Sequence, residues 1–534
     1  MNALNPAGWR PEKGEGGAPV PATTVSGDKG LMLEEPLIFE LGCEGQTGVD
    51  FDFADEAPDP ALGAFLRKDA LALPGLSEPE TMRHYTRLSR QNYAIDLGPF
   101  PLGSCTMKHN PRLNEKMARL PGFADVHPLQ PQETVRGAFA VIDELADWLM
   151  TLTGMPAVAM SPKAGAHGEL CGLLCIRSAL DARGESRPVV LVPESAHGTN
   201  PATAAFAGFR VENIPATEDG RVDLAALEAR LGPDVAGVMI TNPNTCGLFE
   251  RDMKTISDLV HKIGGYVYCD GANFNAIVGR VRPGDLGVDA MHINLHKTFS
   301  TPHGGGGPGS GPVVLSAALA PFAPLPFTVR QPDGSVRLVE EEDAAATGHS
   351  QSFGRMCAFH GQFGMFSRAL TYILSHGADG LRQVAEDAVL NANYVLRSLE
   401  DVLHAPFAAS GPCMHEALFS DDELPEGFTT LDIAKGLIDE GFHPMTVYFP
   451  LVVHGAMLVE PTETESKQGL DRLIASLRSL AERAQAEDAS LKSAPHFAPR
   501  RRLDETLAAR KPVLTWQGHV QTPGSPSLSE IGGS

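Results

Sequence analysis

Residues 292–300 read His-Ile-Asn-Leu-His-Lys-Thr-Phe-Ser, and a glycine-rich run from His303 to Gly311 follows them. Apolar side chains alternate with polar ones from Met291 to Leu295, which predicts a strand that leads to Lys297. We expect a lysine between such a strand and a glycine-rich turn to be shielded from water. Burial disfavours the charged ammonium and lowers its pKa, which a lysine that forms a Schiff base requires.

A carboxylate precedes this lysine at the end of another apolar segment. Residues 266–270 read Tyr-Val-Tyr-Cys-Asp, a short strand pattern. An acid and a later lysine are the pair that pyridoxal phosphate needs, because the acid keeps the ring nitrogen protonated and the lysine holds the aldehyde as an imine. Side chains two apart on a strand share a face. We therefore expect Asp270 to reach the ring nitrogen and the methyl group of Ala272 to lie beneath the ring.

Strand and helix patterns alternate around this pair. We expect strands at 189–192, 210–214, 235–241, 265–270 and 312–316, and helices at 132–153, 202–208, 224–231, 255–263, 364–375 and 380–399. Such alternation predicts an α/β fold, with a mostly parallel sheet and helices on both faces. Ligands of these sheets bind at the carboxyl ends of the strands, which is where Asp270 falls.

Two further segments are placed at the same edge of the predicted sheet. Ala164, Gly165 and Ala166 precede an apolar helix, and such small residues leave backbone N–H groups open to a phosphate. Many helices begin with Gly and Ala, so the signal depends on its place before the first long strand. His197 follows the strand that ends at Val192. Its ring could stack on the cofactor, or it could simply cap a loop.

His292 and His296 are four residues apart, a spacing that metal sites also use. The segment reads as a strand and lacks the glutamate of the H-E-x-x-H motif, so we expect no metal site. His296 is better placed to bind the cofactor phosphate. The run from Gly304 to Gly309 matches G-x-G-x-x-G, but Pro308 removes an amide and a strand follows, which argues against dinucleotide binding.

The composition excludes several classes of partner. Acidic residues outnumber basic ones, 66 against 43, for a formal charge of −23. Nucleic acid and anionic membranes need clustered Lys and Arg instead, and no apolar run approaches the roughly 20 residues of a membrane span. The eight cysteines are scattered without a C-x-x-C motif, which predicts neither disulfides nor zinc and favours a cytoplasmic location.

Composition and pattern divide the chain into six parts. They are a disordered arm at 1–30, an extended segment at 31–132 that wraps a partner or the active site, a large cofactor-binding domain at 133–330, a connecting loop or hairpin at 331–363, a smaller α/β domain at 364–487, and a strap with a disordered tail at 488–534. Within the smaller domain, Thr446 to Val453 reads as a strand.

Five motifs together resemble the P protein family of the glycine cleavage system. They are Ala-Gly-Ala-His-Gly-Glu at 164–169, Ser-Ala-His-Gly-Thr-Asn-Pro-Ala at 195–202, Asp-Gly-Ala-Asn at 270–273, Leu-His-Lys-Thr-Phe at 295–299 and His-Gly-Gly-Gly-Gly-Pro-Gly at 303–309. The resemblance covers roughly residues 75 to 516. It is to the catalytic half of the family alone, as in the split bacterial form, where this half is the β chain.

This resemblance implies the fold-type I fold of pyridoxal-phosphate-dependent transferases, which is similar to that of aspartate aminotransferase and has a smaller C-terminal domain. It implies pyridoxal 5'-phosphate bound covalently on Lys297, with Asp270 at the ring nitrogen and His197 stacked on the ring. The phosphate contacts would come from Ala164 to Ala166 and from His296.

The implied reaction is that of glycine dehydrogenase (decarboxylating), an oxidoreductase. Glycine would displace Lys297 to form an external aldimine, CO2 would leave, and the aminomethyl group would pass to the lipoyl arm of the H protein. Thr245 would hydrogen-bond the ring hydroxyl. The resemblance also implies a homologous α subunit, an α2β2 assembly, and indirect coupling to the T and L proteins.

Two other interpretations remain open on the residues alone. A different fold-type I decarboxylase or desulfurase would use the same Asp270 and Lys297, and product analysis separates it from the favoured activity. The second alternative is a scaffold half that no longer binds cofactor. The presence of both Asp270 and Lys297 argues against it.

Overall fold

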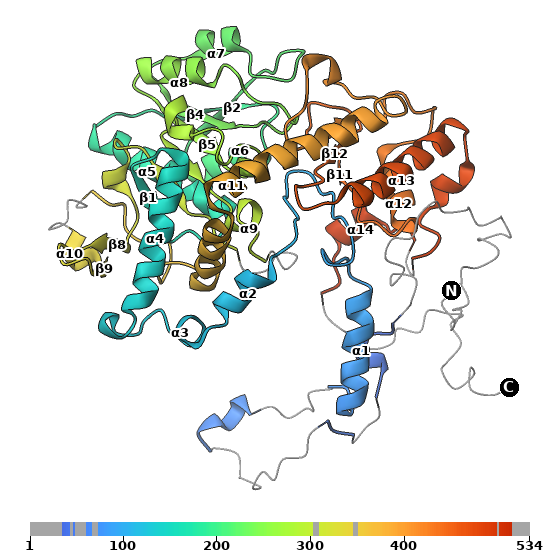
Figure 1. The fold of residues 1–534 in the computed structure, drawn as a ribbon, viewed down its shortest axis with the longest axis horizontal. Helices are drawn as coiled ribbons and strands as arrows, with labels where there is room; N and C mark the ends of the chain where they lie inside the picture. The colour runs from blue at the N-terminus through green and yellow to red at the C-terminus, as the bar shows by residue number, and fades with distance from the viewer. Residues whose placement is uncertain are drawn as a thin grey trace. The chain divides into compact units, whose positions relative to one another are not determined.

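The computed structural model describes residues 35–42, 46–48, 60–66, 73–302, 309–344, 351–498 and 501–514. These residues form two compact units, one with residues 94–492 and one with the described residues before and after them (Figure 1). The predicted arm at 1–30, most of the glycine-rich run and the end of the tail lie outside the described residues. The predicted domain boundaries stay predictions.

The smaller unit contains a regular helix inside the segment that was expected to be extended. α1 spans Glu78–Arg90 and begins with a capping box at 77–80. A Ser-x-x-Glu pattern with a proline in the first turn is a local helix-start signal. The Glu35 carboxylate accepts hydrogen bonds from His84 and Arg87 and so holds the preceding chain on α1. The other elements here are the 3-10 turns Ile38–Glu40 and Pro60–Phe65 and α14, Glu505–Arg510.

The larger unit is built on a seven-stranded sheet. The strands are β1 Ala157–Ala159, β2 Val189–Pro193, β3 Arg210–Ile214, β4 Val235–Thr241, β5 Tyr266–Asp270, β6 Ala290–His292 and β7 Val313–Leu315. Their order is β1-β7-β6-β5-β4-β2-β3, and the neighbouring pairs are parallel except for the two that contain β7. The predicted mostly parallel sheet is therefore confirmed.

Helices cover both faces of this sheet. The helices on the sheet are α4 Arg136–Thr153, α5 Gly165–Ala182, α6 Thr199–Phe206, α7 Leu224–Arg230, α8 Met253–Lys262 and α11 Phe363–Leu399, and α2 Arg112–Ala118 and α3 Pro121–Ala124 pack against α11. In β4, Val238 and Ile240 pack with α4, α8 and α11, whereas Met239 packs with α5 and α6. Side chains alternate between the faces of a strand, so an unbroken apolar run is buried on both sides. None of the helices described is long and apolar enough to cross a membrane.

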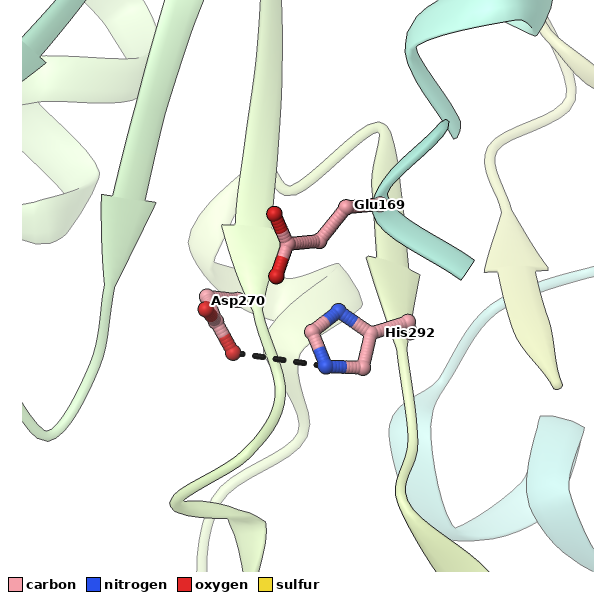
Figure 2. A group of neighbouring side chains, drawn as sticks. All are labelled: Glu169, Asp270 and His292. Carbon is pink, nitrogen blue, oxygen red and sulfur yellow. Dashed lines mark ion pairs between the residues drawn. The ribbon is translucent and has the colours of Figure 1, made fainter. Parts of the chain in front are cut away.

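The chain reverses its direction across the sheet between β2 and β4. It runs from β2 to the edge strand β3 and then crosses back to β4 on the other side of β2. The loops after β2 and β4 therefore diverge and leave a crevice at the carboxyl edge. Asp270 ends β5 and His292 ends β6 at this edge (Figure 2). The placement of Asp270 agrees with the sequence analysis.

A hairpin begins just before the segment at 331–363 that was expected as a loop or hairpin, and its second strand lies inside that segment. β8, Phe327–Arg330, pairs antiparallel with β9, Val336–Val339, and the short helix α10, Glu341–Ala344, follows. α11 then consists of two helices that meet at a kink, as predicted. Gly377, with a φ of 63°, marks the junction between its two parts.

A second, three-stranded sheet follows α11 in the chain. Its elements are β10 Ala417–Phe419, β11 Thr446–Val447, β12 Met457–Val459, α12 Thr430–Asp439 and α13 Lys467–Gln485. The order is β10-β12-β11, with antiparallel pairs, and the end of α11 packs against it together with α12 and α13. The strand predicted at 446–453 is too long, because Tyr448 adopts a left-handed φ of 57° and turns the chain.

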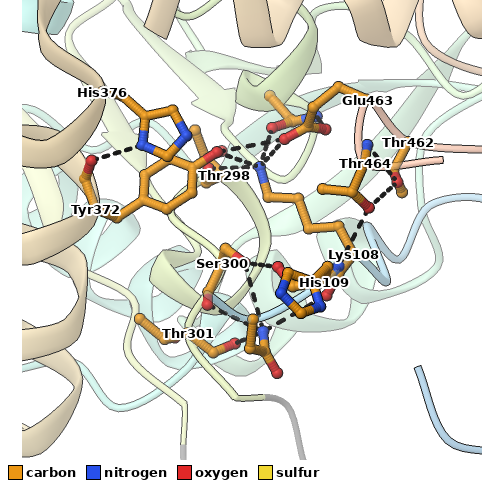
Figure 3. A network of polar contacts seen from close by, with 12 residues as sticks. Lys108, His109, Thr298, Ser300, Thr301, Tyr372, His376, Thr462, Glu463 and Thr464 are labelled. Atoms are coloured by element: carbon orange, nitrogen blue, oxygen red, sulfur yellow. Dashed lines mark hydrogen bonds and ion pairs between the residues drawn. The ribbon is translucent and has the colours of Figure 1, made fainter. Parts of the chain in front are cut away.

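A buried lysine ties four remote segments together next to the carboxyl edge. Lys108 Nζ donates to Asn275 Oδ1 at 2.8 Å, to the Thr298 carbonyl oxygen at 2.9 Å and to the Tyr372 hydroxyl at 3.2 Å. It also forms an ion pair with Glu463 at 2.6 Å (Figure 3). Burial lowers the pKa of Lys108, and the Glu463 carboxylate opposes this effect. A buried charge with these partners is costly to leave unpaired.

We expect Gly271→Ala to destabilise the larger unit. A Cβ atom on Gly271 would lie 1.8 Å from the carbonyl oxygen of His292, so β5 and β6 approach too closely for a side chain there. Overpacking of this kind costs about 1–3 kcal/mol, and the melting temperature should fall. Gly137→Ala in α4 is the matched control, since its Cβ would meet nothing within 4 Å. Equal melting temperatures for the two variants would contradict this expectation.

We expect Lys108→Met to cost about 3 kcal/mol, because it leaves the Glu463 carboxylate buried without its cation. Adding Glu463→Gln should recover part of this loss by removing the stranded charge. Thermal unfolding of the three proteins measures both effects. Lys467→Met removes an exposed lysine paired with Asp471 and should leave the melting temperature unchanged. If the double variant is no more stable than Lys108→Met, the Glu463 carboxylate does not need the Lys108 charge, and the expectation is wrong.

Candidate active site

Lys297 lies on a short helix, so the strand predicted at 291–295 is wrong beyond the end of β6. β6 ends at His292, and α9, Leu295–Thr298, follows it closely. The Asn294 carbonyl oxygen accepts a hydrogen bond from the Lys297 N–H at 3.0 Å, which turns the chain. The apolar residues of this run are buried in the core. Lys297 itself is half-buried and lines a pocket at the carboxyl edge.

The Lys297 ammonium is held by a loop that is remote in the sequence. Nζ donates a hydrogen bond to the carbonyl oxygen of Ser104 at 2.7 Å. Ser104 and Cys105 line the same pocket as Lys297. The segment 31–132 was expected to wrap a partner or the active site, but neither residue was singled out, because an irregular segment carries no periodic signal that indicates where each residue packs.

Asp270 is a buried carboxylate with three polar neighbours. Oδ2 accepts a hydrogen bond from Asn200 Nδ2 at 2.9 Å, Oδ1 accepts one from the Ala272 N–H at 2.9 Å, and His292 Nε2 lies 3.4 Å from Oδ1 (Figure 2). Burial alone would raise the pKa of Asp270, but charge on His292 and the two hydrogen bonds outweigh it and leave the pKa below its usual value. Asp270 therefore stays ionised at neutral pH.

Ala272 lines the pocket, but the expected strand geometry is wrong. β5 ends at Asp270, so Ala272 lies in the following turn and not two residues along the same strand. Its backbone N–H, rather than a shared strand face, links it to Asp270. Asn273 belongs to the same turn and donates from Nδ2 to the Pro243 carbonyl oxygen at 2.9 Å. A carboxylate that accepts from the second N–H after it is a common turn feature, which a strand assignment overlooks.

His197 reaches the pocket from the loop after β2, as predicted, and has polar support. Its Nδ1 lies 2.8 Å from Thr199 Oγ1, which in turn donates to Glu169 Oε1 at 2.8 Å. Glu169 also accepts from the Thr203 hydroxyl at 3.0 Å. The ring of Phe449 contacts His197 edge-on, with centroids 5.4 Å apart. The sequence analysis missed Glu169 and Thr199 as pocket residues, although both lie inside quoted motifs.

The start of α5 contributes backbone rather than side chains to the pocket. Gly165 and Ala166 line it, whereas Ala164 is the residue that precedes the helix and is not part of the lining. No described side chain caps this helix start, so first-turn N–H groups remain for an anion. A Cβ on Gly165 would lie 2.7 Å from Asn294 Nδ2. His296, also in the lining, lies 3.2 Å from the same nitrogen.

Thr245 is buried and lines the pocket, as expected. Its hydroxyl donates to the carbonyl oxygen of Ser195, which ties the loop after β4 to the loop after β2. The proton of Thr245 is therefore already used, and the oxygen keeps only its capacity to accept.

One cavity of about 240 Å³ collects these groups. The predicted residues in its lining are Gly165, Ala166, His197, Thr245, Asp270, Ala272, His296 and Lys297, and the lining residues that were not predicted are Ser104, Cys105, Glu169, Thr199, Thr241, Asn273, His292 and Asn294. Thr241 Oγ1 and Asn294 Oδ1 are buried without a hydrogen-bond partner among the described residues. An amine, a carboxylate, an open helix start and unpaired polar atoms fit an anionic aldehyde cofactor with a basic ring nitrogen.

Two family models match the chain. The aminotransferase class-V model matches residues 174–307, which include Asp270 and Lys297. The model of the glycine dehydrogenase C-terminal domain matches residues 384–496, which include the three-stranded sheet. The two matches follow one another along the chain.

Relatives match nearly the whole chain. The probable glycine dehydrogenase (decarboxylating) subunit 2 of Caulobacter vibrioides is 66% identical over 505 residues, which are 94% of this chain and 95% of the relative. The protein of that name from Desulforamulus reducens is 49% identical over 491 residues, 91% of this chain and 99% of the relative.

A solved structure supports the fold. The glycine decarboxylase (P protein) of the glycine cleavage system, in inhibitor-bound form, aligns with a TM-score of 0.65 at 21% identity and covers 78% of this chain and 93% of its own. The predicted fold-type I architecture and the predicted class of pyridoxal-phosphate enzyme are confirmed, and neither of the two alternative interpretations is favoured. The chain belongs to the family of glycine dehydrogenase (decarboxylating) subunit 2.

Proposed function

We propose that Lys297 binds pyridoxal 5'-phosphate covalently and that the chain uses it to decarboxylate glycine. The observation that carries the site assignment is the meeting of Lys297 and Asp270, from different elements, in one pocket at the carboxyl edge of a parallel sheet. When bound, this cofactor supplies an electron sink for the bond that breaks at the substrate carbon. The remaining chemistry falls to the residues of this chain.

Asp270 is assigned to the ring nitrogen. Its carboxylate is ionised, buried and oriented by Asn200 and Ala272, so it holds a proton on a neighbouring nitrogen through a charge-assisted hydrogen bond. His292 supports this charge from the other side and receives a contact of 2.6 Å from the Tyr268 hydroxyl. The low dielectric of the site strengthens these contacts.

The other assignments follow from position in the pocket. The first-turn N–H groups of α5, at Gly165 and Ala166, and the ring of His296 bind the phosphate. Ala164 acts only by starting the helix. His197 stacks on the ring, where Thr199 and Glu169 fix the orientation of its imidazole. The Thr245 oxygen would accept a hydrogen bond from the ring hydroxyl. Each of these contacts orients the cofactor, and orientation sets which bond of the substrate is cleaved.

The partners follow from the family. A subunit 2 implies a second subunit, and we assign a homologous α chain in an α2β2 assembly. The aminomethyl acceptor is the lipoyl arm of the H protein, which links the chain indirectly to the T and L proteins. A cytoplasmic location remains a prediction.

The function is tested by exchange of labelled CO2 into the carboxyl group of glycine. Exchange should require this chain, its partner subunit and lipoylated H protein together, and it should be absent with alanine or glutamate as the amino acid. Borohydride reduction should fix the cofactor on a peptide that contains Lys297. Lys297→Ala should abolish both signals. Exchange without the lipoylated protein, or an adduct on Lys163 or Lys108 instead, would refute the proposal.

We expect Asp270→Asn to weaken cofactor binding and to lower the exchange rate by orders of magnitude, because an amide does not hold the ring-nitrogen proton. The amide still accepts from the Ala272 N–H, so the fold should persist. Asp289→Asn is the matched control: Asp289 is also buried and accepts hydrogen bonds from a histidine, His261, and a backbone N–H. Near-normal turnover in Asp270→Asn would rule out the ring-nitrogen role.

A further inference from the structure

The loop that holds Lys297 is itself fixed by the three-stranded sheet. The Gly103 N–H donates to the Leu458 carbonyl oxygen at 3.3 Å, and the Thr446 hydroxyl donates to the Gly103 carbonyl oxygen at 2.7 Å. A Cβ on Gly103 would lie 2.4 Å from Leu458, so loop and strand are in close contact. Ser104 follows with a left-handed φ of 60°, which non-glycine residues adopt at a cost.

A buried glutamate holds Ser104 in this conformation. The Ser104 N–H donates to Glu416 Oε1, and the Ser104 carbonyl oxygen accepts from Lys297 Nζ at 2.7 Å. Glu416 is fully buried and directly precedes β10. Lys297 and Glu416 are thus connected through two backbone groups of one residue.

Glu416 belongs to a buried cluster, which we call the 415/416/460 cluster, of His415, Glu416 and Glu460. All three residues are fully buried, and one ligand atom from each lies within 4.8 Å of the others. His415 Nε2 and Glu416 Oε2 are 4.0 Å apart. Both nitrogens of His415 have no hydrogen-bond partner within the described ranges, whereas the Glu416 and Glu460 carboxyl groups lie against each other and the Thr106 hydroxyl lies against Glu460. Groups this deeply buried are normally satisfied, so protons or water must serve them.

The electrostatics of the 415/416/460 cluster indicate where the proton lies. Burial raises the pKa of Glu416 to about 7. Burial, with the Glu416 charge next in size, raises the pKa of Glu460 well above its usual value. Burial, with the Lys297 charge, lowers the pKa of His415 to about 3. The titratable groups that face the acid pair within the described residues are Lys297, Lys108, His415, Glu463, Cys105, Cys246 and Cys413.

We propose that Glu416 and Glu460 form a positioning device for Lys297, in which the two carboxyl groups share one proton and act on the lysine through the Ser104 backbone. The carboxyl oxygen of Glu416 fixes the peptide that receives the ammonium. The single negative charge of the pair stabilises that ammonium without a direct contact. Neither acid lines the pocket, so both are positioning residues. The proposal rests on the proposed function of Lys297.

A divalent cation is a competing occupant of the 415/416/460 cluster, because His and Glu are common metal ligands. The Lys297 ammonium already supplies the positive charge that the two acids need, since it lowers the pKa of Glu416 against the larger effect of burial. The structure favours the proton, and metal content is one outcome of the test.

The positioning role is tested on the assembled enzyme by comparing Glu416→Gln with Glu416→Ala. Glutamine keeps an oxygen that accepts from the Ser104 N–H, whereas alanine does not. We expect Glu416→Ala to lose the circular-dichroism signal of the cofactor held on Lys297 and Glu416→Gln to retain it. Glu250→Gln, a buried acid whose pKa burial also raises to about 7, is the control and should match the unaltered protein. Equal signals in both Glu416 variants would overturn the proposal.

The shared proton is tested on the same assembly after the cofactor has been removed. The measurement is the rate at which an amine-directed acylating reagent modifies Lys297. Each single variant, Glu416→Gln or Glu460→Gln, leaves one ionisable carboxyl group and should change the rate less than about twofold. The double variant carries no charge, so the rate should rise about tenfold, which corresponds to 1.4 kcal/mol. Additive single effects, or one divalent cation per chain that the double variant loses, would overturn the proposal.

These two tests separate the inference from the proposed function. If borohydride fixes no cofactor on Lys297 in the unaltered protein, the proposed function fails, but the acylation rates still report whether the acid pair controls the lysine. If the cofactor is fixed there and the double variant acylates at the unaltered rate, the inference alone fails.

Discussion

A carboxylate can stay ionised in the interior of a protein only where other groups compensate its charge. Asp270 meets this condition at the end of β5, because Asn200 comes from α6, the Ala272 N–H from the following turn and His292 from β6. The parallel sheet brings these elements to one edge. The site chemistry and the sheet are therefore interdependent: the strand order sets the neighbours of Asp270, and those neighbours keep it charged.

The surroundings of Lys297 depend on contacts between segments of the larger unit that are far apart in the sequence. The Lys297 ammonium donates its hydrogen bond to the carbonyl oxygen of Ser104 and not to a group of the preceding strand. Lys108, four residues after Ser104, binds the carbonyl oxygen of Thr298, which follows Lys297 directly. Lys108 also binds the Glu463 carboxylate. The loop from 103 to 108 thus contacts both α9 and the segment that follows β12 and links the two. This arrangement explains why a segment without regular structure is so well enclosed.

The two family matches contain different parts of the site. The aminotransferase class-V match contains the acid and the lysine, and the glycine dehydrogenase match contains Glu416 and Glu463, which bind Ser104 and Lys108 of the loop that reaches the lysine. Fold-type I architecture supplies a place for the cofactor. The C-terminal segment contributes to the surroundings of the Lys297 amine through Glu416 and Ser104.

The amino-acid sequence alone determined the long strands, the class of fold and the pair Asp270 and Lys297. Unbroken apolar runs such as 235–241 that alternate with helical patterns favour a parallel sheet covered on both faces, and the polar residues at the carboxyl ends of its strands meet at one edge. Local patterns misplaced Lys297 and Ala272, because alternation over a few residues fits a strand as well as a buried turn. Only the tertiary structure decided that Ser104 receives the Lys297 ammonium and that Glu416 holds Ser104. Their places depend on packing between segments hundreds of residues apart, and no periodicity in the chain records such packing.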